Sequence, residues 1–243
     1  MYISWPSVLA FVFGLIACGP VVAQGVSATA APQNAAPTSQ GLATSATSWP
    51  SATIEWNTEG FLGPCHGDCN AAIYGGREVR TELSRILLLI KPTPIWETQW
   101  GDSQLVAGTF SRRLATVWGK LNIEPEVGVA KRFGIMNAGE FWAGLTFRWI
   151  ALPWNDVVKT TVAVTEGVSL ATQVEREERR ESVPGHKGSV ILNFFSPEIT
   201  FAPPTVTAYE VFFRLHHRSG IFGLINTVEG GAQYETVGIR FHF

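Results

Sequence analysis

Hydrophobic and polar residues alternate along most of the chain after residue 70. The alternation is clearest over 121–131, and it recurs over 141–149, 158–164, 209–216 and 237–243. A period of two places alternate side chains on opposite faces of a β-strand. Less regular strands are predicted over 103–116 and 188–200, and a weak one over 70–79. The pattern therefore predicts eight strands of about ten residues, each long enough to cross a bilayer.

A soluble β-domain with one wet face also fits alternation by itself. Two further features favour an all-β, eight-stranded, antiparallel up-and-down outer-membrane barrel over 70–243. The polar faces carry charges of both signs, which suits a narrow interior of paired groups; these charges are Glu124, Glu126, Glu210, Arg148, Lys159 and Arg214. Short predicted connections near 117–119, 151–156 and 202–205 alternate with longer ones near 80–102, 132–138, 170–187 and 219–231, as in such barrels. The chain ends on an aromatic residue of the apolar face, Phe243.

The composition is consistent with this fold and does not point to a nucleic-acid-binding protein. Hydrophobic residues make up 46% of the chain and charged residues 16%, with a formal net charge of −2. The charge gives no reason to expect a nucleic-acid partner. Several tryptophans are expected to include anchors at the membrane interface, as in aromatic girdles; they are Trp96, Trp100, Trp118, Trp142, Trp149 and Trp154.

The first 23 residues resemble an export signal. An apolar run from Val8 to Cys18 has the length of a signal-peptide core, and Val21-Val22-Ala23 supplies a small-residue cleavage site. Alternatives are a lipoprotein processing site at Cys18 and an uncleaved anchor. All three readings place the protein outside the cytoplasm. Residues 24–69, rich in Ala, Ser and Thr in their first half, are predicted to form a flexible leader.

Cys65 and Cys69 lie within this leader, in Pro64-Cys65-His66-Gly67-Asp68-Cys69. In an oxidising compartment, a small disulfide loop is the simplest interpretation. Free thiols and a metal site are alternatives, although only His66 and Asp68 are nearby as further ligands.

The stretch from Arg214 to Gly220 contains the candidate chemistry. His217 and Ser219 are two residues apart, on the same apolar face as Leu215, whereas His216 points into the barrel with Glu210 and Arg214. Polar side chains facing lipid are costly. One interpretation places both residues at the level of the lipid headgroups; the other makes them a histidine base beside a serine nucleophile.

This His-x-Ser pair, one strand before the C-terminus, resembles that of the lipid A 3-O-deacylase family of eight-stranded outer-membrane barrels. The resemblance implies that Ser219 attacks an ester of lipid A while His217 takes its proton. The family has an orienting Glu about a dozen residues later; here Gln233 lies nearest that position and Glu235 lies beyond it. Gly220 replaces the family's Asn, so the oxyanion donor is expected to be a backbone N–H, such as that of Gly220, or Asn226.

The resulting hypothesis is an outer-membrane esterase that acts on lipid A or lipopolysaccharide and needs no metal or other cofactor. The alternative is a non-catalytic barrel that stabilises the membrane or presents its loops to a partner. The absence of Glu and Asn at the family's positions supports this alternative, as does the charged segment 175–181.

Overall fold

The computed structural model describes residues 53–60, 62–81, 83–86, 97–174, 188–221, 224–226, 228 and 231–243. The export signal and most of the leader lie outside these residues. Eight antiparallel strands form a closed barrel, which confirms the predicted fold. They are β2 (Cys69–Val79), β3 (Trp100–Arg112), β5 (Leu121–Gly134), β6 (Gly139–Trp149), β7 (Lys159–Ala171), β8 (Ile191–Ala202), β9 (Tyr209–Ser219) and β10 (Gly231–His242).

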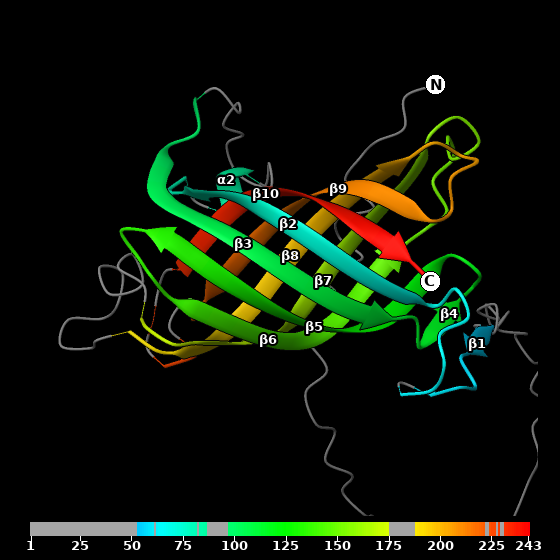
Figure 1. Ribbon diagram of the computed structural model, residues 1–243, viewed down its shortest axis with the longest axis horizontal. Coiled ribbons are helices and arrows are strands. Elements are labelled where there is room, and N and C mark those ends of the chain that lie inside the picture. Colours follow the sequence, from blue (N-terminus) through cyan, green and yellow to red (C-terminus); the bar gives the residue numbers. More distant parts are fainter. Residues whose placement is uncertain are drawn as a thin grey trace, which may run out of the picture. The chain divides into compact units, whose positions relative to one another are not determined.

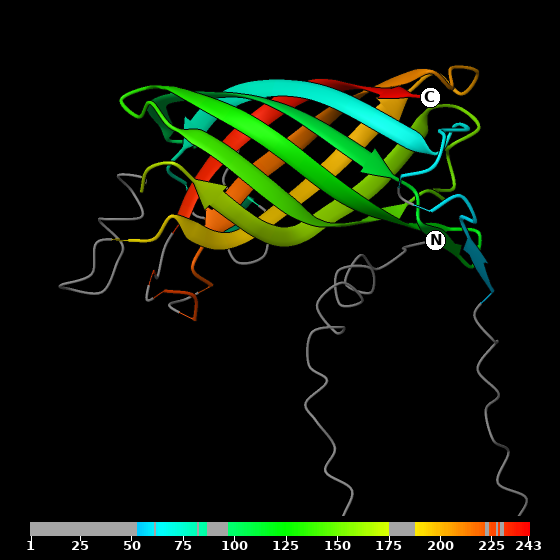
Figure 2. The same cartoon turned by 60° about the horizontal axis from the view of Figure 1, so that its bottom comes forward.

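The barrel strands follow one another up and down, and β10 closes the barrel by pairing with β2 (Figure 1). The strands run obliquely across the front and back walls (Figure 2). At the end of this seam, the backbones of Cys69 and Phe243 exchange two hydrogen bonds, of 3.2 and 3.0 Å. A single helical turn, α2 (Leu83–Ile86), follows β2. No helix among the described residues is long and apolar enough to cross a membrane.

The barrel has two different ends. At the turn end, which also holds Phe243, the connections are 118–120, 150–158 and 203–208; at the loop end they are 80–99, 135–138, 172–190 and 220–230. The predicted long connection near 132–138 is wrong, because β5 and β6 extend further than their alternation indicates and leave only residues 135–138 between them.

Paired charges fill the interior, as the sequence predicts. Glu198 is the centre of this network: its carboxylate accepts hydrogen bonds from Arg148 at 2.8 Å, Arg214 at 2.8 Å and Arg240 at 2.6 Å. Arg214 also bonds both oxygens of Glu126, and Arg240 also bonds Glu210. Each of these buried charges thus meets opposite charges and hydrogen-bond partners, the arrangement that makes ionic burial tolerable.

Aromatic rings occupy the rest of the interior, and glycines leave the room for them. Trp142 lies inside the barrel, where it stacks on Phe194 and donates to Glu126 at 3.1 Å. It faces Gly128 across β5 and β6; a Cβ on Gly128 would lie 2.1 Å from the indole. The expectation that Trp142 is an interfacial anchor is therefore not met, because Trp142 has the inward parity of its strand.

The outward face is apolar over most of its height. Large exposed side chains on consecutive strands include Val129, Phe141, Leu145, Val162, Ile199, Phe213, Val237, Ile239 and Phe241. Trp118, Trp149 and Trp154 are exposed at the turn end, and Trp100 at the loop end. Trp96 lies outside the described residues.

The segment before β2 is described over 53–60 and 62–68, where its short strand and hydrogen bonds differ from the predicted flexible leader up to residue 69. Within it, β1 (Ile54–Trp56) pairs with β4 (Ala115–Val117), a short strand that continues β3 beyond a break. Sequence alternation cannot reveal a three-residue strand. Cys65 and Cys69 form a disulfide.

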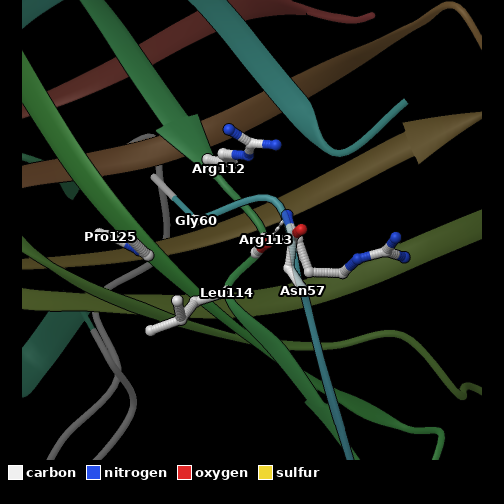
Figure 3. A pocket seen from close by; sticks show the side chains of 6 residues that line it. All are labelled: Asn57, Gly60, Arg112, Arg113, Leu114 and Pro125. Atoms are coloured by element: carbon white, nitrogen blue, oxygen red, sulfur yellow. Dashed lines mark hydrogen bonds between the residues drawn. The ribbon is translucent and has the colours of Figure 1, made fainter. Parts of the chain in front are cut away.

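Asp68 anchors this segment to the turn end. Its carboxylate accepts hydrogen bonds from the Arg112 guanidinium at 2.6 Å, from the backbone N–H of His66 at 2.8 Å and from the Asn57 amide. Burial raises the pKa of Asp68, but these hydrogen bonds outweigh it and lower the pKa to about 2. Beside this anchor, Asn57, Arg113 and Pro125 help to line a hollow with no room for a water molecule (Figure 3).

Candidate functional site

A group of polar side chains lies on the outward face of the barrel near its loop end. We call it the polar track; its members are Glu166 on β7, Asn193 on β8, His217 and Ser219 on β9, and Gln233 on β10. Strand pairing places Ser219 directly opposite Asn193 and His217 directly opposite Gln233. Directly opposed residues of antiparallel strands have Cβ atoms about 5 Å apart. The track thus joins four neighbouring strands.

His217 faces outward yet is only 7% exposed. Its Nδ1 atom is buried and has no hydrogen-bond partner among the described residues, and the same holds for Oε1 of Gln233. The Gln233 amide nitrogen donates to the carbonyl of Thr81, in the segment that follows β2. This contact fixes the Gln233 side chain beside His217. It leaves Gln233 Oε1 without a hydrogen bond from the described residues.

His217 and Ser219 converge on the backbone of Gly231. A Cβ built on Gly231 would lie 2.2 Å from the Arg218 carbonyl oxygen, 2.8 Å from Cβ of Ser219 and 3.1 Å from Cε1 of His217. The missing side chain of Gly231 therefore makes room for both. No hydrogen bond joins the Ser219 hydroxyl to the His217 ring, although the structure describes both residues. In a histidine-serine pair, such a bond often tightens only when substrate is bound.

The remaining predicted site residues lie at different distances from this pair. Glu235 faces outward, opposite Leu215 on one side and Arg77 on the other, so it is one outward position further along β10 than Gln233. Gln233, rather than Glu235, is the direct neighbour of His217.

The two predicted oxyanion donors also differ. Gly220 follows Ser219 directly, and its Cα is packed so closely that a Cβ would lie 2.0 Å from the Val228 carbonyl oxygen. The Asn226 amide instead donates to Ser189 Oγ and to the Ile191 carbonyl, both at 2.9 Å. These two bonds occupy both amide hydrogens of Asn226, which leaves the backbone N–H of Gly220 as the nearer candidate.

His216 points into the barrel, as its parity predicts. Its ring nitrogens lie 2.9 Å from the Tyr74 hydroxyl and 3.1 Å from Glu140, and its ring packs edge-on against Trp142. Its hydrogen-bond partners are not Glu210 and Arg214 but residues of β2 and β6, two strands that do not pair with β9. His216 is thus a packed interior residue, separate from the polar track.

Sequence reasoning missed Glu166, Asn193 and the role of Gly231. The outward positions of β7 are otherwise apolar, and Glu166 interrupts them; the series is Val162, Val164, Val168 and Leu170. Continuing the alternation along the whole of β7 would therefore have identified Glu166 as a polar residue on the outward face. Asn193 interrupts the outward series of β8 in the same way. The role of Gly231 depends on strand register, which no local pattern reveals.

The turn end contains another hollow, of about 270 Å³, lined by residues that include Trp56, His66, Asp68 and Arg113. It lies at the opposite end of the barrel from Ser219. Among the described residues, no group of three or more His, Cys, Asp or Glu side chains is arranged to hold a metal ion.

No protein-family model matches the sequence, and no curated protein is significantly similar to it. Solved barrels are similar at low identity. Neisserial surface protein A is 10% identical, with 73% of this chain and 98% of that chain covered and a TM-score of 0.43. The outer membrane enzyme PagL is 10% identical, with 71% and 98% covered and a TM-score of 0.44. The N-terminal barrel domain of Pseudomonas aeruginosa OprF is 9% identical, with 74% and 100% covered and a TM-score of 0.40. The fold of this chain is established by its own strand pairing.

Proposed function

We propose that this protein is an outer-membrane barrel whose His217 and Ser219 hydrolyse an ester of a membrane lipid, with lipid A as the substrate. The outward face of the barrel is apolar, as a bilayer requires, and the polar interior is filled by side chains. A lipid therefore reaches the protein from outside the barrel. The observation that carries the proposal is the convergence of His217 and Ser219 on Gly231, on the outward face at the loop end.

In the proposed reaction, the Ser219 hydroxyl attacks the ester carbonyl while a nitrogen of His217 takes its proton. His217 then returns the proton to the leaving alcohol, and water releases the acyl chain by the same route. The backbone N–H of Gly220 is the candidate donor to the oxyanion. Gln233, which lies directly opposite His217, supplies the candidate acceptor, Oε1, that orients the His217 ring. A neutral amide stabilises the imidazolium less than a carboxylate does.

The test compares lipid A by mass spectrometry from cells that carry no protein, the parent protein, Ser219→Ala or His217→Ala. Gln104→Ala, at an outward polar position near the loop end of β3, is the matched control. We expect the parent and the control to remove an acyl chain, and the two site variants to leave lipid A intact while still folding. If the purified, folded parent releases no fatty acid from lipid A or from simple ester lipids, the proposal fails.

A second candidate function is a non-catalytic barrel with a structural or surface-interaction role. The missing Ser219–His217 hydrogen bond and the lack of a carboxylate directly opposite His217 favour it. It predicts that Ser219→Ala has no effect on lipid A, whereas deletion of the whole protein changes envelope permeability.

A further inference from the structure

The short strand β1 lies beside β4 at the turn end of the barrel, outside the closed wall (Figure 1). The wall strand β3 ends at Arg112, and β4 then pairs with the first residues of β5 in its place. Since β1 pairs in turn with β4, the three strands form a ribbon that continues the sheet of the barrel beyond the end of β3.

The register of this ribbon gives β1 an apolar and a polar face. Ile123 lies on the outward face of β5 and is paired with Ala115 on β4, and Ala115 is paired with Trp56. Directly paired residues share one face of a sheet. Trp56 therefore faces outward, as does Ile54 two residues before it, whereas Glu55 faces the other side. The apolar face of β1 is thus continuous with the outward wall of the barrel.

The described residues leave the apolar face of β1 uncovered. Trp56 is 63% exposed, more than any other tryptophan that the structure describes, and Ile54 is 46% exposed. Single exposed apolar side chains are normal in water, but these two adjoin a wall that is apolar over most of its height. Tryptophan is also the residue enriched where hydrocarbon meets water at a membrane. Lipid therefore fits this face better than water does.

The backbone of β1 limits how deep this face can lie. The Asn57 N–H donates to the Leu114 carbonyl at 2.8 Å, so odd-numbered residues of β1 bond to β4. The N–H and C=O groups of Ile54 and Trp56 point the other way, to an edge with which no described strand pairs. Unpaired backbone groups are costly in hydrocarbon. The strand therefore belongs at the headgroup level, where water reaches its free edge.

The tilt of the strands gives the same height for Trp56. Rows of paired residues descend toward the turn end from β7 to β6, because Val162, three residues inside β7, is paired with Trp149, the last residue of β6. For strands about 4.8 Å apart and tilted by about 40°, each step along a row changes the height by about 3 Å. Trp56 is in the row of Phe147, three steps further on, and so lies about 9 Å nearer the turn end. Trp149, two residues beyond Phe147 on the same strand, lies about 5 Å nearer the turn end. With Trp149 at the edge of the hydrocarbon, Trp56 lies about 4 Å into a headgroup layer that is about 5–7 Å thick.

We infer that β1 is a membrane anchor: Trp56 and Ile54 contact the lipids of the leaflet at the turn end, at the headgroup level, while Glu55 on the other face stays in water. The partner of this surface is the bilayer itself. The anchor holds the segment before the barrel on the membrane surface. It requires only the lipid-facing wall of the barrel and is independent of ester hydrolysis at Ser219.

The test follows the tryptophan fluorescence of the purified protein in phosphatidylcholine nanodiscs, which leave both membrane faces open to water. Trp56→Phe removes the reporter, and Glu55→Trp added to Trp56→Phe returns a tryptophan to the opposite face of the same strand. Subtracting the Trp56→Phe emission isolates the signal of Trp56 or of the introduced tryptophan. The quenchers are phosphatidylcholine brominated near the carbonyl end of its acyl chains and acrylamide in the water. Heat-modifiable migration on SDS gels checks that each variant folds.

We expect brominated lipid to quench Trp56 at least about twofold more strongly than the tryptophan introduced by Glu55→Trp, and acrylamide to quench them in the reverse order. Ile54→Trp added to Trp56→Phe, which places the reporter on the apolar face again, should restore quenching by lipid. Equal quenching of the two faces would overturn the inference, as would a Trp56 signal that acrylamide quenches and lipid does not. A Trp56 signal that neither quencher reaches would also overturn it, because protein then covers the face.

Discussion

Replacement of Gly128 by alanine should destabilise the barrel through Trp142. The new Cβ would lie 2.1 Å from Cζ2 and 2.4 Å from Cε2 of the indole, so the ring has to move. Overpacking of this kind costs about 1–3 kcal/mol. Displacement also strains the hydrogen bond from the indole N–H to Glu126, and such bonds to charged groups are worth about 1.5–3 kcal/mol. Together these effects predict a loss of about 2.5–6 kcal/mol.

The measurement is reversible urea unfolding in detergent micelles, followed by circular dichroism. Gly108→Ala is the matched control, because a Cβ on Gly108 meets only the Ala72 carbonyl oxygen, at 3.7 Å, and should change stability by less than about 0.5 kcal/mol. In a Trp142→Phe background the Gly128→Ala penalty should shrink by at least about 1 kcal/mol, because phenyl lacks the clashing atoms. Equal penalties at Gly128 and Gly108, or an unchanged penalty beside phenylalanine, would refute this account of the interior.

Three other substitutions test separate parts of the structure. Glu198→Leu leaves three buried arginines without their shared carboxylate and should lower the free energy of unfolding in urea by about 3 kcal/mol or more; a neutral result would contradict the network. Asp68 has a folded pKa of about 2 against an ordinary 3.8, so its ionised form stabilises the fold above pH 3.8, and this stabilisation is lost as the pH falls toward 2. Unfolding midpoints should therefore drop more over this range in the parent than in Asp68→Asn, and parallel curves would be evidence against the anchor. Gly231→Ala should reduce ester hydrolysis at least tenfold, because its Cβ would clash with the Arg218 carbonyl oxygen at 2.2 Å and with Ser219 and His217, and so displace both side chains; full activity in a folded variant would contradict their convergence.

The sequence predicted the strands and their faces well because a period of two depends only on local residue order. It placed His216 in the interior, for example, but not beside Tyr74 and Glu140, which come from β2 and β6, strands that do not pair with β9. Contacts across a barrel depend on strand tilt and stagger, and these are properties of the closed sheet.

For the candidate site, too, the sequence predicted which face of a strand each residue occupies but not which residues lie opposite one another. The parity of β9 places His217 and Ser219 outward, and this follows from the sequence alone. That Gln233 rather than Glu235 faces His217 depends on the register of β9 and β10, which the connection 220–230 leaves undetermined. The role of Gly231 could not be predicted, since only the paired strands show what its missing side chain makes room for.

The seam between β2 and β10 has a consequence for how the barrel assembles. All other pairings between barrel strands join consecutive strands, which can pair as soon as their hairpin has been made. The seam instead joins the first and last strands of the barrel, down to the bonds between Cys69 and Phe243, so it closes only after β10 has been synthesised. Until that moment two bare strand edges are available for pairing with other chains. The edge of β2 therefore has to be shielded during the synthesis of the strands that follow it, and a short deletion within β10 harms assembly more than an equally short deletion in a connecting loop.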